Sequence, residues 1–308
     1  MQDNRLNKQH KFSPTAGKKR TENLVKIFLF ACALVSILTT VGIVWVLFSE
    51  SLPFFDKVSL KEFFLGTQWY PLFEPKRYGI LPLIGGTLMI AIGAAIVALP
   101  IGTGSAIYLS EYATAKQRAV LKPFLEILAG IPTVVYGYFA LTVITPVIQK
   151  IFPSTNIFNA ASGAIVVGIM IIPMIASLSD DAMRSVPDSL RNAAFALGGT
   201  KLDVSAKVVF PSALSGVVAS YVLALSRAIG ETMAVTLAAG ATPKLTLNPL
   251  ESIQTMTAYI VQVSLGDTPA GSISYQTVFA VGLTLFLMTF VMNIMAQKFL
   301  HKFREQYD

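Results

Sequence analysis

The sequence predicts an all-α integral membrane protein with six transmembrane helices. Of its 308 residues, 54% are hydrophobic and only 13% are charged, and the mean hydropathy is +0.62. Soluble domains carry about 25% charged residues. The ionisable residues also collect in short segments between long intervals that contain none, and membrane spans require this distribution. Lipid is therefore the expected solvent for most of the chain.

Six intervals are long enough to cover ~30 Å of hydrocarbon, which takes about 20 helical residues. They are residues 27–49, 78–110, 127–149, 151–179, 208–226 with a continuation past two charges, and 268–297. The first interval follows a basic segment, as a signal peptide does. It is longer than the roughly 7 to 15 apolar residues of a signal peptide, and no A-x-A cleavage site follows it. We therefore expect the first span to be retained.

The distribution of Lys and Arg predicts the orientation. Six spans put both termini on one side, and with that side inside, seventeen Lys and Arg lie in inner segments and six in outer segments. This bias favours a bacterial inner membrane protein with cytoplasmic termini. The first 26 residues account for +5 of the formal charge of +7, so the charge does not indicate nucleic-acid binding. We predict a basic tail (1–26), a first span with an outer segment (27–79), a core domain (80–300) and a second tail (301–308).

The first outer segment, Glu50 to Gly79, is rich in aromatic residues and proline. It contains Trp69, Tyr70 and several Phe residues. We favour an aromatic anchor at the membrane surface, where Trp and Tyr are enriched. A docking surface for an external partner is the alternative.

Proline and glycine predict interruptions in two spans. The second span should bend or break near Pro100, because proline removes a backbone hydrogen bond and clashes with the preceding turn. The third span opens with the segment 130–137, GIPTVVYG. Close helix packing explains most of the scattered glycines. Broken helices at membrane depth are tolerated only inside protein or along a cavity, so for this segment we favour a pathway wall with Thr133 and Tyr136 as candidate contacts.

Arg227 and Glu231 are the charged residues of the fifth span. Their spacing of four predicts one helix face and an ion pair. An unpaired charge near mid-bilayer costs at least ~2.5 to 3.5 kcal/mol, so this face should look inward. One interpretation is that Arg227 meets an anion while Glu231 holds the guanidinium in place. The other is a neutralised pair that only fixes helix packing.

The inner segment 180–211 predicts a short helix. Pro187 suits its first turn, Gly198 and Gly199 suit its end, and four residues repeat at the helical spacing i, i+3, i+4, i+7. These residues are Leu190, Ala193, Ala194 and Leu197. A helix with one apolar face could rest on the membrane or on its own bundle, or dock into a groove of another protein.

The spacing in this segment resembles the signature of bacterial ABC importer permeases. That signature reads E-A-A, three residues, Gly, nine residues, Ile, one residue, Leu-Pro. The corresponding residues here, with every gap kept, are Asn192-Ala193-Ala194, Gly198, Val208 and Phe210-Pro211. The departures are Asn for Glu, Val for Ile and Phe for Leu, and the apolar part of the docking surface is kept.

The resemblance implies a type I importer permease whose inner helix is a coupling helix that docks into an ATPase subunit. The implied coupling residues are Leu190, Asn192, Ala193, Ala194, Leu197 and Gly198. Three further stretches, 106–112, 130–137 and 227–235, look like the phosphate permeases of the Pst system, PstC more than PstA. This implies a heterodimer with a PstA-like sister permease, two PstB-like ATPase subunits that carry ATP and Mg, and a PstS-like phosphate-binding protein outside.

The chain lacks the motifs of an enzyme. No G-x-x-x-x-G-K-[ST] sequence occurs, so ATP must be hydrolysed on another chain. Cys32 is the single cysteine and His10 and His301 are the only histidines, so we expect no catalytic site, no metal site and no bound cofactor. The rival functions are a permease for another oxyanion or small solute, and a membrane signalling or scaffold subunit that senses phosphate. An ion-driven secondary transporter is disfavoured by the docking-type loop.

Overall fold

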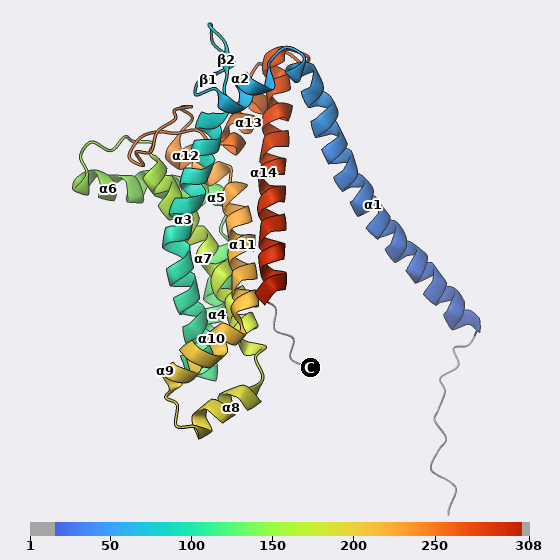
Figure 1. Cartoon of the computed structure of the whole chain (residues 1–308), viewed down its shortest axis with the longest axis vertical. Helices are drawn as coiled ribbons and strands as arrows, with labels where there is room; N and C mark the ends of the chain where they lie inside the picture. Colours follow the sequence, from blue (N-terminus) through green and yellow to red (C-terminus); the bar gives the residue numbers. More distant parts are fainter. Residues whose placement is uncertain (1–15, 304–308) are drawn as a thin grey trace, which may run out of the picture. The chain divides into compact units, whose positions relative to one another are not determined.

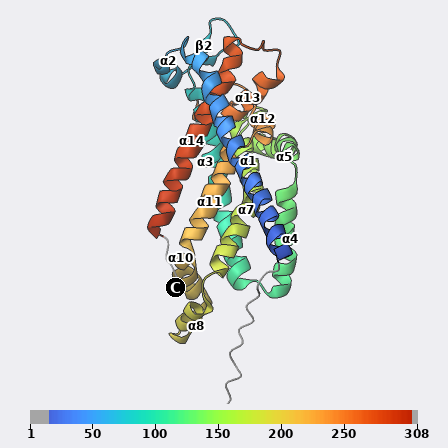
Figure 2. The same cartoon turned by 90° about the vertical axis from the view of Figure 1, so that its right-hand side faces the viewer.

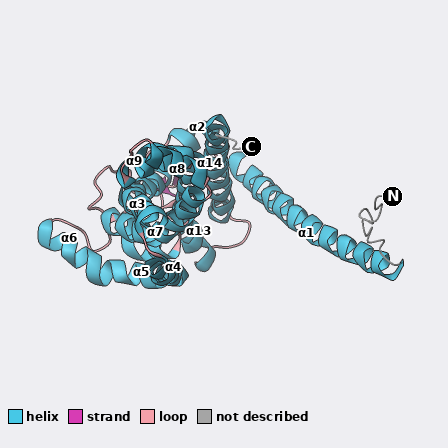
Figure 3. Ribbon diagram, turned by 90° about the horizontal axis from the view of Figure 1, so that it is seen from below, coloured by secondary structure: helices cyan, strands magenta, loops and turns pink. Residues whose placement is uncertain are grey.

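The computed structural model describes residues 16–303, and side chains are described for residues 22–298. Nearly all of this part is helix, with one small strand pair (Figure 3). The chain divides into two units, Met1–Ser49 and Glu50–Asp308. The boundaries predicted from the sequence stay predictions.

The elements follow in chain order. They are α1 (Ala16–Phe55), α2 (Leu60–Leu65), β1 (Trp69–Tyr70), β2 (Arg77–Tyr78), α3 (Leu81–Ile107), the π-helical turn η1 (Tyr108–Tyr112), α4 (Ala115–Gly130), α5 (Thr133–Phe139), the π-helical turn η2 (Ala140–Ile144), α6 (Thr145–Ile151) and α7 (Ala160–Arg184). After these come α8 (Asp188–Ala196), α9 (Lys201–Val204), the π-helical turn η3 (Ser205–Val209), α10 (Phe210–Ser212), α11 (Leu214–Ile229), α12 (Met233–Ala239), α13 (Met256–Leu265) and α14 (Ile273–Phe303).

Five helices of the described chain are long and apolar enough to cross a membrane. They are Glu22–Phe55, Leu81–Tyr112, Thr133–Ile151, Ala160–Arg184 and Ile273–Lys298. A sixth span results if Lys201–Ser212 and Leu214–Ile229, which meet at a bend of 69°, count as one. The predicted all-α fold with six spans is confirmed in this form, and the protein is a multi-pass membrane protein.

Four long helices run side by side in the second unit (Figures 1 and 2): α3, α7, α11 and α14. The contact between α3 and α7 is the most extensive. A Cβ atom on Gly93 would lie 2.6 Å from Ala164 Cβ, and one on Gly168 would lie 2.9 Å from Val97 Cβ. Small residues let the two backbones approach in this way, as they do between membrane helices. The main core cluster, which includes the fully buried Ile171, lies along this contact.

The β1–β2 end of the second unit has an aromatic core of its own. The two strands pair antiparallel with Trp69 opposite Tyr78, and Trp69 is only 1% exposed. Its ring packs edge-on against Phe63 and Tyr259. The interfacial-anchor interpretation is therefore wrong for Trp69, which helps to fold the segment, whereas Tyr70 is exposed at the surface.

Helix boundaries differ from the sequence prediction at two places. α7 begins at Ala160 and not near Ile151, because residues 152–159 form a loop that ends in a helix cap, where Asn159 Oδ1 accepts from Ser162 N at 2.8 Å. α3 continues through Pro100, and the helical pattern changes only at η1. The helices α12 and α13 were not predicted, and they occupy a stretch interpreted as part of a span and an outer loop.

Candidate transport pathway and coupling loop

The third span is interrupted where the sequence predicts it. α4 ends at Gly130, Ile131 and Pro132 are extended, and α5 starts at Thr133. The Tyr136 hydroxyl donates to the Leu128 carbonyl oxygen across the interruption, at 2.7 Å. That carbonyl belongs to the last turn of α4, where it also accepts a long hydrogen bond from Ile131 N at 3.4 Å. Tyr136 is buried and fastens the broken helix, whereas Thr133 is half-buried at the start of α5.

The orientation of α11 is fixed by the burial of its residues. Ala224 and Ala228 are buried against the bundle, and the Ser226 hydroxyl donates to Asn293 Oδ1 of α14 at 3.0 Å. Leu223 and Arg227, on the neighbouring face of the helix, are exposed in the single chain. Tyr136 of α5 belongs to the same buried cluster as Ala224 and Ala228 of α11. Two of the four predicted pathway residues, Tyr136 and Arg227, thus come from elements that meet in one cluster.

The predicted pairing of Arg227 with Glu231 on one helix face is wrong. α11 ends at Ile229, so the two residues do not share a helix, and within residues 22–298 no ion pair joins them. Glu231 is 8% exposed and its Oε1 accepts from Ala234 N at 3.1 Å, in the first turn of α12. A carboxylate there satisfies an unpaired amide and complements the helix dipole. The Glu231 carbonyl oxygen also accepts from the Thr257 hydroxyl at 2.9 Å, which ties the turn to α13.

The helix predicted in the inner segment is present as α8. Pro187 precedes its first turn, and Gly198 has a φ of +84°, a conformation that glycine adopts without a steric penalty. α8 lies at the end of the second unit opposite β1 and β2 (Figures 1 and 2). The prediction of a short structured helix from the punctuating residues is confirmed.

The apolar residues of α8 divide between two faces. Leu190 and Ala194 pack against a small cluster of the chain itself that includes Met183 and Val204. Leu197 is 91% exposed, and Asn192, Ala193 and Gly198 are exposed as well. That these residues contact an ATPase subunit stays a prediction.

Sequence reasoning missed two exposed apolar residues beside them. Phe195 is 46% exposed and Leu202, in α9, is 67% exposed. Neither belongs to the repeat of apolar positions that guided the prediction. Two members of that repeat, Leu190 and Ala194, pack against the bundle instead. The exposed apolar side chains of α8, its C-terminal cap and α9 therefore include Ala193, Phe195, Leu197 and Leu202.

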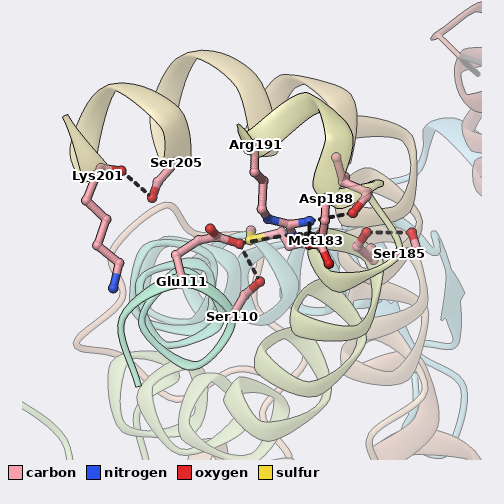
Figure 4. Close-up of polar contacts among 10 residues, drawn as sticks. Ser110, Glu111, Met183, Ser185, Asp188, Arg191, Lys201 and Ser205 are labelled. Carbon is pink, nitrogen blue, oxygen red and sulfur yellow. Dashed lines mark hydrogen bonds and ion pairs between the residues drawn. The ribbon is translucent and has the colours of Figure 1, made fainter. Parts of the chain in front are cut away.

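Arg191 is a further residue that the sequence did not single out. Its guanidinium donates to the Met183 carbonyl oxygen at 2.8 Å, to the Val186 carbonyl oxygen, and to Glu111 Oε1 at 3.2 Å (Figure 4). It also meets Asp188 Oδ1 at 3.2 Å. One side chain of α8 thus holds the end of α7 and the turn η1 that follows α3. The planar fork of arginine provides enough donors for this.

A broken-helix bundle with a structured loop helix that exposes apolar side chains is the architecture of a membrane transport subunit that works with a partner protein. The sequence pattern of the binding-protein-dependent transport system inner membrane components matches residues 98–305, and the chain belongs to this family.

Curated relatives agree with this assignment over most of the chain. The probable ABC transporter permease protein YqgH of Bacillus subtilis is 37% identical over 86% of this chain and 86% of its own length. The phosphate transport system permease protein PstC of Xylella fastidiosa is 33% identical over 76% of this chain and 77% of its own. The predicted resemblance to the Pst permeases, and to PstC among them, is confirmed.

Solved structures support the fold alone. A bacterial ABC transporter involved in the import of alginate superposes with a TM-score of 0.62 at 13% identity, over 93% of this chain and all of that one. The MetNI methionine ABC transporter, in an inward-facing conformation, gives 0.55 at 18% identity, over 74% of this chain and 95% of that one. The ABC importer permease architecture is therefore correct, as the coupling-loop signature implies.

Proposed function

We propose that this chain is the permease subunit of an ATP-binding-cassette importer that moves inorganic phosphate across the bacterial inner membrane. The PstC relatives support the cargo, since several of them are phosphate transport permeases that match more than two thirds of the chain. The importer architecture supports the class.

Arg227 is the observation that carries the proposal. It lies in an apolar helix, exposed on the face next to the packed residues Ala224 and Ala228. A guanidinium at membrane depth is costly beside lipid, so this face belongs against a second polar surface or a water-filled route. Arginine remains charged and its fork matches oxyanion oxygens. The open face of α11, with Tyr136 nearby, suits one wall of an anion pathway whose other wall is a sister permease.

The partners follow from the same architecture. The sister permease is PstA-like, two PstB-like ATPase subunits bind ATP and Mg, and a PstS-like protein delivers phosphate outside. We assign the α8 end of the second unit to the cytoplasm, where Leu197 and Phe195 meet the ATPase. This chain carries no ATPase site of its own and performs no chemistry on its cargo, since its sequence has no phosphate-binding loop.

In this mechanism, ATP binding closes the ATPase pair and opens a route between the two permeases. Arg227 lowers the barrier for an anion that moves through a region of low dielectric. Binding at Arg227 is weak, because a tight site would retain the ion and not pass it on. Glu231 does not contact the anion and instead fixes the start of α12. Thr133, the first residue of α5, lines the wall of the pathway at the interruption.

Reconstituted vesicles that contain the permease pair, the ATPase and the phosphate-binding protein test the proposal. ATP-dependent uptake of labelled phosphate that is not reduced by excess sulfate or molybdate supports it. Uptake of a different solute identifies a permease for that cargo. ATPase assembly without any dependence of uptake on this chain identifies a signalling or scaffold subunit, and either of these two results overturns the proposal.

A further inference from the structure

The π-helical turn η1, which follows α3, is contacted by cations from both helices of the coupling loop. Arg191 of α8 lies 3.2 Å from Glu111, the fourth residue of η1. Lys201 of α9 lies with its Nζ 5.0 Å from the ring centre of Tyr112, the last residue of η1. We refer to these two interactions as the η1 contacts. They join α8 and α9 to the turn that directly follows the long helix α3.

The contact through Glu111 is well shielded from water. The side chain of Glu111 is 9% exposed and that of Arg191 is 14% exposed. Ser110 donates to the same carboxylate oxygen, Oε1, at 2.8 Å (Figure 4). A shielded charge-assisted hydrogen bond is stronger than an exposed one, and it is geometrically demanding. Displacement of α8 therefore pulls on Glu111 and does not simply stretch a loose surface pair.

The contact through Tyr112 has a different chemical basis. A cation over an aromatic face is attracted by the ring, and the attraction needs no directional hydrogen bond. Lys201 begins α9, and its carbonyl oxygen accepts from the Ser205 hydroxyl at 2.8 Å, which holds the start of α9 to the next turn (Figure 4). The two contacts thus reach neighbouring positions of η1 from two separate helices.

The hydrogen bonding of η1 suits a turn that moves when α8 and α9 move. A π-helical turn has wider hydrogen bonding than an α-helix, here from Ala113 N to Tyr108 O at 2.7 Å, and such turns occur frequently at functional sites. The helix that precedes it, α3, packs closely on α7 through Gly93 and Gly168. Arg191 also donates to carbonyl oxygens at the end of α7. It therefore contacts both α7 and the turn that follows α3.

We propose that the η1 contacts couple the movement of α8 and α9 to α3 and α7, so that Glu111, Arg191, Lys201 and Tyr112 are positioning residues for transport. This rests on the proposed function. Loss of the contacts leaves the exposed face of α8 intact, so the ATPase still binds. What is lost is the conversion of ATP hydrolysis into movement of the pathway helices.

The test compares variants in the reconstituted importer by the ratio of solute taken up to ATP hydrolysed. Glu111→Gln, Arg191→Lys and Tyr112→Leu are expected to lower this ratio at least about fivefold, the lower end of measured coupling between sites. Tyr112→Phe keeps the ring and is expected to keep the ratio. Lys207→Met is the matched control, since Lys207 pairs with Asp203 in the same loop and makes no contact with η1 among the described residues.

Co-purification of the ATPase with each variant separates coupling from assembly. A lowered ratio with normal ATPase binding supports the proposal. An unchanged ratio in Glu111→Gln and Tyr112→Leu overturns it, as does an equal loss in Lys207→Met. If Glu111→Gln does not fold, Tyr112→Leu against Tyr112→Phe decides alone. Should wild-type vesicles import another solute and not phosphate, the proposed function fails, and the same ratio measured with that solute still decides on the η1 contacts.

Discussion

Arg118 donates to Asp180 at 2.6 Å, from α4 to the last two turns of α7. The Asp180 side chain is fully buried and that of Arg118 is 19% exposed. Lys122 supports the pair, with its Nζ 2.9 Å from the neighbouring carboxylate of Asp181. In the described part of the chain, all ion pairs between α4 and α7 come from Arg118 and Lys122.

Breaking this ion pair should destabilise the protein. Asp180→Asn removes the nearest counter-ion of the largely buried Arg118, whose other carboxylate partner, Asp181, lies 4.0 Å away. We expect a loss of about 3 kcal/mol, the lower end for broken buried pairs, because Arg118 keeps this partner and some contact with water. The Tm of the purified protein in detergent measures it. The double variant Arg118→Met/Asp180→Leu should recover most of the loss, and failure to recover any would contradict a pairwise interaction.

The exposed face of α8 and its packed face should respond differently to substitution. Leu197→Asp places a charge on a residue that is 91% exposed, so the fold should remain while the ATPase no longer co-purifies. Leu190→Ala removes packing from the small internal cluster, and we expect a loss of about 1 to 2 kcal/mol, less than for a fully buried Leu. Normal ATPase recovery with Leu197→Asp would exclude this face as the docking surface.

The loop between α12 and α13 should carry a pH-dependent contribution to stability. Lys244 Nζ lies 2.5 Å from Glu251 Oε2, and this interaction holds the pKa of Glu251 below its ordinary value of 4.5. Because the folded protein prefers the ionised form, the contribution is complete above pH 4.5 and is lost as the pH falls through the lowered pKa.

Lys244→Gln tests this sign. Its Tm should lie below that of the wild type at pH 7, and the difference should disappear on acidification. A Tm difference that grows as the pH falls would contradict the assignment. Asp56→Asn, at an exposed carboxylate on the same end of the second unit, serves as the control for general acid effects.

Local signals sufficed for much of the fold. α8 was predictable because Pro187 and Gly198 punctuate it and the residues between them favour helix, so its ends need no distant contact. The break after Gly130 was predictable for the same reason, since Gly130 and Pro132 together disfavour helix there, whereas Pro100 alone does not interrupt α3.

Features that depend on distant contacts escaped prediction. α11 ends at Ile229 in a turn that is bonded to Thr257, which is 26 residues away, and this contact separates Arg227 from Glu231. Trp69 is buried because Tyr259 covers it, although its own segment reads as a surface anchor. The η1 contacts join residues 80 or more positions apart, and periodicity within one helix cannot show them.

ATP-driven uptake of labelled phosphate by vesicles with the assembled importer tests the central claim most directly when Arg227 is replaced. With Arg227→Gln, uptake should be abolished while the permease pair, the ATPase and their ATP hydrolysis remain, and Arg227→Lys should retain part of the uptake because the charge is kept. Uptake at the wild-type rate by Arg227→Gln would contradict an anion pathway along the open face of α11.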